Sequence, residues 1–328
     1  MESVKNKVQI RDNPWSGLVN GFLTMPGRDA MIGLLILFAV FSLLSPHFLS
    51  VRNIINILLQ GSINAIVSFG MIFVIISGGI DLSLGSIVGL TGIVLGLTLT
   101  AGMPILLAVA ITMVVGAICG LINGLFITRF KLTPFIVTLG SQGIFRGVAY
   151  LLNNGKPVFG MPHRFIQSIA GTQWGIPRPV LIMFAGAVVC HVLLTQTKLG
   201  QYARAIGSNE QAAKVCGINV NRYLIWVYTA AGLLATVSSL VVVARLRAAE
   251  PIAGMSYELE AVAAVVLGGA SLSGGVGSVM GALIGAILIS TLKNGLNILG
   301  VQAYYQQILI GFVLVAAVIL DQARRKQA

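Results

Sequence analysis

The chain has 328 residues, of which 56% are hydrophobic and only 9% are charged. Soluble domains carry about 25% charged residues, so this composition excludes an ordinary water-soluble protein and predicts one surrounded by membrane lipid. The net charge of +12 does not indicate nucleic-acid binding, because the Lys and Arg residues lie in short links between apolar runs.

The Cys and His residues give no indication of a disulfide framework or a metal site. Cys119, Cys190 and Cys216 are isolated in the sequence, and the three His residues have no ligand spacing. We therefore expect this chain to hold no metal and no cofactor.

Segment 1–29 is polar and lacks the apolar region of a signal peptide, so the first apolar run is expected to stay in the protein. A helix of about 20 apolar residues can cross a membrane. Ten such runs follow, at 30–46, 61–77, 84–101, 103–128, 134–152, 178–196, 223–245, 258–270, 279–298 and 306–321. The run 258–270 is short and ends in Gly, which is typical of a broken or re-entrant segment.

The sequence therefore predicts an all-α fold, a polytopic membrane helix bundle of about ten transmembrane segments that form one domain at 30–321. Ten crossings put both termini on one side, and most of the 21 Lys and Arg residues then lie on that side. Positive residues mark cytoplasmic segments of an inner-membrane protein. We therefore expect 1–29, the loop 197–222 and the tail 322–328 to be cytoplasmic, and the loop 153–177 to be periplasmic.

A short motif occurs twice. Gly-Gly-Ile-Asp-Leu-Ser at 78–83 recurs as Gly-Gly-Ala-Ser-Leu-Ser at 268–273, and each copy leads through Gly-Ser into another apolar run. In the predicted topology both copies run in the same direction, which indicates a parallel internal repeat with broken helices near a transport path. Coincidence among Gly-rich segments is the alternative. If the repeat is real, both turns should lie at equivalent depths, with Asp81 or Ser271 capping the segment that follows.

The apolar run that follows the second copy has small residues at every fourth position, with Gly277, Gly281 and Gly285 in one series. Ser278, Ala282 and Ala286 form the other series. Such spacing lets helices approach closely in lipid, either within one subunit or between two copies.

The 197–222 loop contains a short predicted helix that begins at Glu210, after Ser208 or Asn209 as a cap, and ends at Gly217. So short a helix is unstable alone in water, so a partner or the bundle must hold it. It could pass movement from a bound motor protein to the membrane helices. The candidate coupling residues are Ser208, Asn209, Glu210, Gln211, Ala212, Ala213 and Gly217.

From about Ser45 to Asp321 the chain resembles the ATP-binding-cassette carbohydrate-importer permeases of the ribose, galactose, xylose and autoinducer-2 family, and is most similar to ribose permeases. The motifs are specific to the family rather than to one sugar. They are Ile-Ile-Ser-Gly-Gly-Ile-Asp-Leu-Ser at 75–83, Gly-Gln-Tyr at 200–202, Gly-Ser-Asn-Glu at 207–210, Gly-Ile-Asn-Val at 217–220, Tyr-Glu-Leu at 257–259, Ala-Val-Val-Leu-Gly-Gly at 264–269, Asn-Gly-Leu-Asn at 294–297 and Tyr-Tyr-Gln at 304–306.

This resemblance implies a homodimeric permease that works with a separate cytoplasmic ATPase subunit and a periplasmic or lipoprotein sugar-binding protein. It also implies that Glu-Gln-Ala-Ala at 210–213 is a degenerate Glu-Ala-Ala coupling motif that docks on the ATPase. The substrate would be a monosaccharide, ribose or a similar sugar.

Polar residues inside the apolar runs are candidates for the translocation path, because such residues are costly in lipid. Each also has a structural interpretation. Asp81 could cap the next helix, Arg146 could bind carbonyl groups or reach outward to the interface, and amides often join neighbouring helices. The candidates are Asp81, Asn64, Gln142, Arg146, Asn294 and Asn297.

Three further acidic residues, Glu250, Glu258 and Glu260, are expected at the outer mouth beside Arg245 and Arg247. There they would form a solvated rim or contact the binding protein.

The sequence does not predict an enzyme. The nucleotide-binding pattern Gly-x-x-x-x-Gly-Lys-Ser/Thr is absent, and the Gly-Lys at 155–156 is followed by Pro157. The energy for transport would therefore come from ATP hydrolysis by another chain. A secondary sugar carrier is one alternative, although it would need several intramembrane acids where the sequence offers essentially Asp81. Another polytopic membrane protein, such as a lipid-modifying enzyme, is the second.

Overall fold

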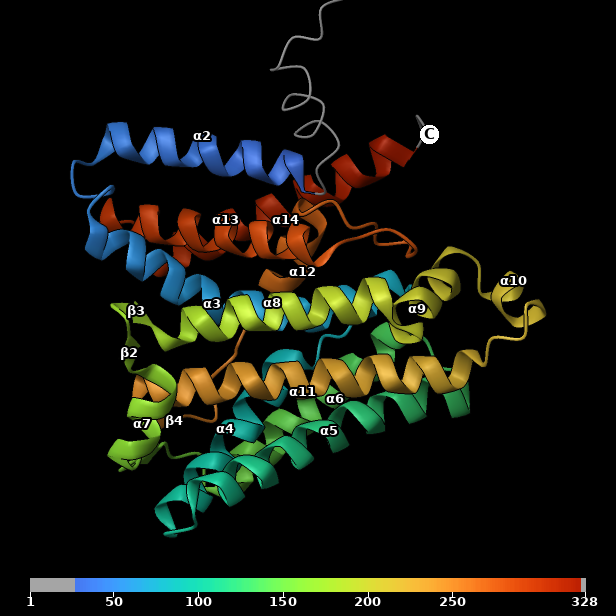
Figure 1. Ribbon diagram of the computed structural model, residues 1–328, viewed down its shortest axis with the longest axis horizontal. Coiled ribbons are helices and arrows are strands. Elements are labelled where there is room, and N and C mark those ends of the chain that lie inside the picture. Colours follow the sequence, from blue (N-terminus) through green and yellow to red (C-terminus); the bar gives the residue numbers. More distant parts are fainter. Residues whose placement is uncertain (1–26, 326–328) are drawn as a thin grey trace, which may run out of the picture.

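The computed structural model describes residues 27–325, so nearly all of the predicted segment 1–29 and the last three residues of the tail lie outside it. The fold is a bundle of helices that run along one common direction (Figure 1). The helices are α2 Arg28–Leu44, α3 Val51–Ile76, α4 Leu84–Thr100, α5 Ile105–Phe130, α6 Pro134–Leu152, α7 His163–Ala170, α8 Arg178–Gln196, α9 Lys198–Ser208, α10 Glu210–Val215, α11 Val220–Leu246, α12 Tyr257–Leu267, α13 Val279–Ile298 and α14 Ala303–Arg325.

The two ends of the bundle differ in structure. Helices α9 and α10 project from one end, here called the α10 end, at the right of Figure 1. The opposite end, here called the α7 end, carries α7 and two small antiparallel ladders: β1 (Val158–Phe159) pairs with β4 (Ala248–Ala249), and β2 (Thr172–Gln173) pairs with β3 (Ile176–Pro177). The start of α2 and the end of α14 both lie toward the α10 end (Figure 1).

The structure confirms a polytopic helical membrane protein. Within residues 27–325, six helices are long and apolar enough to cross a membrane, namely α3, α5, α6, α8, α11 and α13, and α4 and the apolar part of α14 are shorter. Each of the ten predicted segments corresponds to a helix, whereas ten complete crossings remain a prediction. The predicted start at 61 was wrong, because α3 begins at Val51, where the Ser50 side chain accepts a hydrogen bond from the Asn53 amide.

Helix α12 has only 11 residues and is therefore about 16 Å long, about half the thickness of the hydrocarbon core. The segment before it leaves β4 at the α7 end and returns along α4. A side chain on Gly89 would contact the carbonyls of Pro251 and Ala253, and one on Gly85 would contact that of Gly254. Helices α4 and α12 therefore begin beside each other inside the bundle and run toward opposite ends.

Glycines allow the closest helix contacts in the core. Helix α11 packs on α5 at Gly116 and Gly120, where an added Cβ would lie 1.7 Å from the Thr236 hydroxyl and 2.2 Å from the Tyr228 carbonyl. Helix α13 packs on α12 in the same way. An added Cβ on Gly285 would lie 1.9 Å from the Ala264 carbonyl, so the small residues of α13 serve packing within one subunit.

Candidate functional site

Two acidic residues are buried where α12 begins. Glu258 and Glu260 are only 5% and 7% exposed. The Gln142 side chain donates to Glu258 Oε1 at 3.1 Å, and Lys293 Nζ lies 2.8 Å from Glu260 Oε1. Asn64 donates to the other Glu260 oxygen at 3.5 Å. The expected solvated rim is therefore wrong for these two acids, because the 247–256 segment folds back into the bundle before α12 starts.

Arg146 fixes that returning segment. Its guanidinium donates to the carbonyls of Pro251, of Ala253 at 2.7 Å and of Gly85 at 3.0 Å. The carbonyl-binding interpretation is confirmed, and the outward-reaching one is wrong. One charged side chain on α6 thus holds both the start of α4 and the segment that leads into α12.

Asp81 stabilises the turn before α4. Its Oδ1 accepts from the Ser83 amide at 2.8 Å and from the Ser83 hydroxyl at 2.6 Å, and Asn123 donates to the same hydroxyl at 2.8 Å. The second carboxylate oxygen is buried and has no hydrogen-bond partner among residues 27–325, and the same holds for the hydroxyl of Tyr228. These contacts support the structural interpretation of Asp81, whereas its role in transport stays a prediction.

We expect Asp81→Asn to keep most transport activity and Asp81→Ala to lose most of it. Asparagine keeps the acceptor for Ser83, whereas alanine leaves buried donors unpaired at a cost of about 1–3 kcal/mol. Uptake and thermal stability of both variants would be measured in parallel. Complete loss of uptake in both variants, with normal stability, would instead indicate that the charge itself is required.

The second motif copy resembles the first only in part. Ser271 and Ser273 side chains lie 3.0 Å apart, at the positions that match Asp81 and Ser83. The predicted cap was wrong, however, because Ser278 caps α13 by accepting from the Gly281 amide at 2.9 Å. Five residues separate Ser273 from α13, so no helix starts directly after the second copy.

Both motif turns lie together at the α10 end. The Gly275 amide donates to the Ile76 carbonyl at 2.8 Å. Gly207, in the last turn of α9, lies against both of these backbone groups. A Cβ added to Gly207 would be 1.8 Å from the Ile76 carbonyl oxygen and 2.7 Å from the Gly275 amide nitrogen. Three segments far apart in sequence therefore meet at Gly207. The duplication that would explain the two turns stays a prediction.

The predicted pair of amides on α13 is divided between two environments. Asn294 is buried, and its carbonyl oxygen has no protein partner. Asn297 is exposed and accepts a hydrogen bond from Gln306 of α14 at 2.7 Å. The path candidates Asn64, Gln142 and Arg146 thus gather near the start of α12, whereas Asp81 and Asn297 lie apart from that group.

The predicted coupling helix is present as α10. Asn209, not Ser208, caps it, since its side chain accepts from the Ala212 amide at 2.9 Å, and Gly217 ends it with a φ of 80°. Ala213 is buried and packs beside Ile206 and Val220. The other residues of α10 face outward, and they are Glu210, Gln211, Ala212, Lys214 and Val215.

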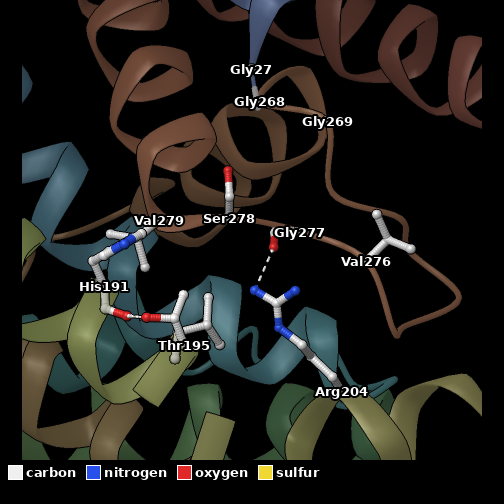
Figure 2. Close-up of a pocket in the computed structure, with 11 residues that line it drawn as sticks. Gly27, His191, Thr195, Arg204, Gly268, Gly269, Val276, Gly277, Ser278 and Val279 are labelled. Atoms are coloured by element: carbon white, nitrogen blue, oxygen red, sulfur yellow. Dashed lines mark hydrogen bonds between the residues drawn. The ribbon is translucent and has the colours of Figure 1, made fainter. Parts of the chain in front are cut away.

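A cavity of about 340 Å³ opens at the α10 end between α8, α9 and the loop that precedes α13. Figure 2 shows Arg204 reaching across it to the Gly277 carbonyl, at 3.2 Å, with His191 and Thr195 on the opposite wall. A second cavity of about 330 Å³ lies between α10 and the end of α5, with Glu210 and Tyr228 in its wall. The second cavity, but not the first, is therefore lined by residues of α10.

Sequence reasoning missed Glu258, Glu260 and Lys293 as one group. Lys293 lies inside an apolar run, and the two acids lie at the start of another. Opposite charges in two neighbouring apolar runs were the signal from which Lys293 and the two acids could have been paired.

Residues 53–318 match the family described as branched-chain amino acid transport system / permease component. The ribose import permease protein of Bacillus subtilis (strain 168) is 44% identical over 299 residues, which cover 90% of this chain and 92% of that protein. The ribose import permease protein of Escherichia coli (strain K12) is 43% identical over 302 residues, 91% of this chain and 94% of that protein. The D-allose transport system permease protein of the same strain is 39% identical over 291 residues, 88% of this chain and 89% of that protein. No solved structure gives a significant match. The expected resemblance is confirmed, and the chain belongs to this family of transport-system permease components.

Proposed function

We propose that the chain is the membrane-spanning permease of an ATP-driven importer for a monosaccharide, with ribose as the first candidate. The observation that carries this function is the similarity to ribose import permeases over about nine tenths of the chain. The buried polar group at the start of α12 supports it, because a sugar needs hydrogen-bond donors and acceptors along its route through lipid.

The α10 end is then the cytoplasmic end in an inner membrane, with both termini cytoplasmic, and the α7 end receives sugar from a periplasmic or lipoprotein binding protein. A separate ATPase docks on α10. This assignment is supported by the excess of positive residues expected on the inner side and by the outward-facing residues of α10, which include a 90% exposed Val215.

We expect Val215→Glu to weaken recruitment of the ATPase by about tenfold, because a charge replaces an exposed apolar contact within the docking surface. Co-purification of the ATPase with the tagged permease would measure it. Val276→Glu is the matched control, since Val276 is also exposed at the α10 end but lies outside α10. Equal recruitment by both variants, or crosslinks that place the ATPase away from α10, would contradict this docking surface.

The permease acts as a homodimer, and α6 is the proposed contact. Gly140, Gly143 and Gly147 are exposed on α6, and an added Cβ at any of them would meet no atom within 4 Å. The Gly-x-x-x-Gly spacing of the last two suits close packing against another helix in lipid. The part of the subunit that the structure describes leaves this stripe uncovered, unlike the small residues of α13.

Reconstitution in vesicles tests the function. The permease, the ATPase and the binding protein encoded beside it should together accumulate radiolabelled ribose only when ATP is present on the ATPase side. A panel of other monosaccharides would define the substrate. Absence of ATP-dependent uptake for every sugar in the panel would refute the proposal.

A secondary sugar carrier was the alternative interpretation of the sequence, and the similarity to ribose import permeases does not favour it. The same vesicles discriminate between the two functions. Uptake by the permease alone, driven by an imposed proton or sodium gradient without ATP, would support the carrier.

A further inference from the structure

A groove of about 350 Å³ lies between α12, α13 and α14, and a charged pair forms part of its wall. Lys293 Nζ and Glu260 Oε1 are 2.8 Å apart, with side-chain exposures of 31% and 9%. Asn64 donates to the second oxygen of Glu260 from α3. The acid is thus fixed by two neighbouring helices, while the ammonium group remains accessible from the groove.

The position of this pair makes contact with lipid unfavourable. Lys293 lies on α13, the 20-residue helix Val279–Ile298, before its last turn, and Glu260 lies in the first turn of a helix that begins inside the bundle. Charged side chains at membrane depth face the protein interior or a water-filled cavity, where they mark substrate pathways. The groove therefore suits a polar ligand better than an acyl chain.

The rest of the groove offers two kinds of surface. Ser256 and Gln307 are polar, and the Ser256 side chain makes no capping bond to α12. Leu259 and Ile310 are apolar. A sugar has the same division, with hydroxyl groups around its edge and C–H groups on its faces. The volume of the groove lies in the range of small-molecule sites, about 300–1,000 Å³.

We propose that Glu260 and Lys293 form a binding station for the transported monosaccharide in this groove. The carboxylate accepts hydrogen bonds from sugar hydroxyls and the ammonium group donates to them, so the pair serves a neutral ligand without net charge. This inference rests on the proposed function and adds the residues that contact the sugar during its passage.

Uptake by the assembled importer is the first test. Glu260→Gln and Lys293→Met should each lower the rate of sugar uptake by about tenfold or more, because each removes a charged hydrogen-bonding partner. Lys293→Arg, which keeps the charge, should retain more activity. Lys198→Met, which removes an exposed Lys at the start of α9 and outside α10, is the matched control and should transport normally. Recruitment of the ATPase should be unchanged in both groove variants. Uptake is compared at equal amounts of folded importer, because loss of either partner leaves a largely buried charge unpaired and lowers thermal stability.

Protection of an introduced cysteine separates a sugar contact from a purely structural ion pair. Cys216 is the exposed native cysteine, and Cys119 and Cys190 are buried, so Cys216→Ser provides the background. Gln307→Cys should react with a charged thiol reagent, and its labelling should slow when the importer turns over with ribose instead of without sugar. Val276→Cys, at a position that is 61% exposed at the α10 end and outside α10, should be labelled equally in both conditions.

The results distinguish a failure of the binding station from a failure of the proposed function. If the wild-type importer transports a sugar while both groove variants transport normally, or that sugar leaves labelling at 307 unchanged, the binding station is refuted and the proposed function stands. Protection by leucine rather than by ribose would also refute it, since a zwitterion could bridge the two charges. If wild-type vesicles take up no sugar, the proposed function itself fails.

Discussion

Replacement of Arg146 by leucine is expected to unfold the centre of the bundle and abolish transport. Arg146 donates to three carbonyls, those of Gly85, Pro251 and Ala253. A hydrogen bond to a charged group contributes about 1.5–3 kcal/mol, so loss of all three should lower the free energy of unfolding by about 3 kcal/mol or more. Titration of the purified protein with a denaturing detergent would measure the change.

Arg146→Lys is the informative companion. Lysine keeps the charge but presents a single nitrogen in place of the planar fork, so it should recover only part of the lost stability. Gln142→Leu on the same helix removes one bond, to Glu258, and should cost less than Arg146→Leu. A stable, fully active Arg146→Leu variant would show that the segment before α12 is held by other contacts.

Gly207→Ala is expected to uncouple ATP hydrolysis from transport. The added methyl group would lie 1.8 Å from the Ile76 carbonyl and 2.7 Å from the Gly275 nitrogen, and backbone atoms cannot move away cheaply. The end of α9 must then separate from the two motif turns. Sugar uptake should fall by about tenfold or more, while the ATPase still co-purifies and hydrolyses ATP.

Gly186→Ala on α8 is the control for the added methyl group, because its Cβ would lie 3.6 Å from the nearest atom, a Phe69 ring carbon, which is an ordinary contact. Normal transport by both variants would show that the contact at Gly207 is not part of the coupling route. Loss of ATPase recruitment in Gly207→Ala would instead indicate damage to α10 itself.

The sequence predicted the helical segments well because most of them are apolar along their whole length. The start of α3 was misplaced, since Asn53 and Gln60 interrupt the apolar pattern although both lie within the helix. Helix α10 was located almost to the residue, because local chemistry sets its limits: Asn209 caps it and Gly217 supplies the left-handed turn after it.

The interior polar group could not be assembled from the sequence. The segment 247–256 resembles an outer loop because it contains an Arg, a Glu and a Pro and comes shortly after Arg245. Only the tertiary contacts of Arg146 bring it back along α4 and carry Glu258 inside. The local sequence pattern cannot predict that this segment folds back into the bundle, because the fold-back depends on Arg146, about one hundred residues away.

The shared starting point of α4 and α12 also bears on how the chain is made. Ribosomes deliver α4 long before α12, so at that stage the first turn of α4 lies in the membrane without Gly254 and Glu258, its later neighbours. The packing of α4 against α12 can be completed only after residue 267 has been synthesised and inserted. Biogenesis should therefore pass through a long-lived, protease-sensitive intermediate, and chains truncated before α12 should be degraded even though most of their membrane segments are complete.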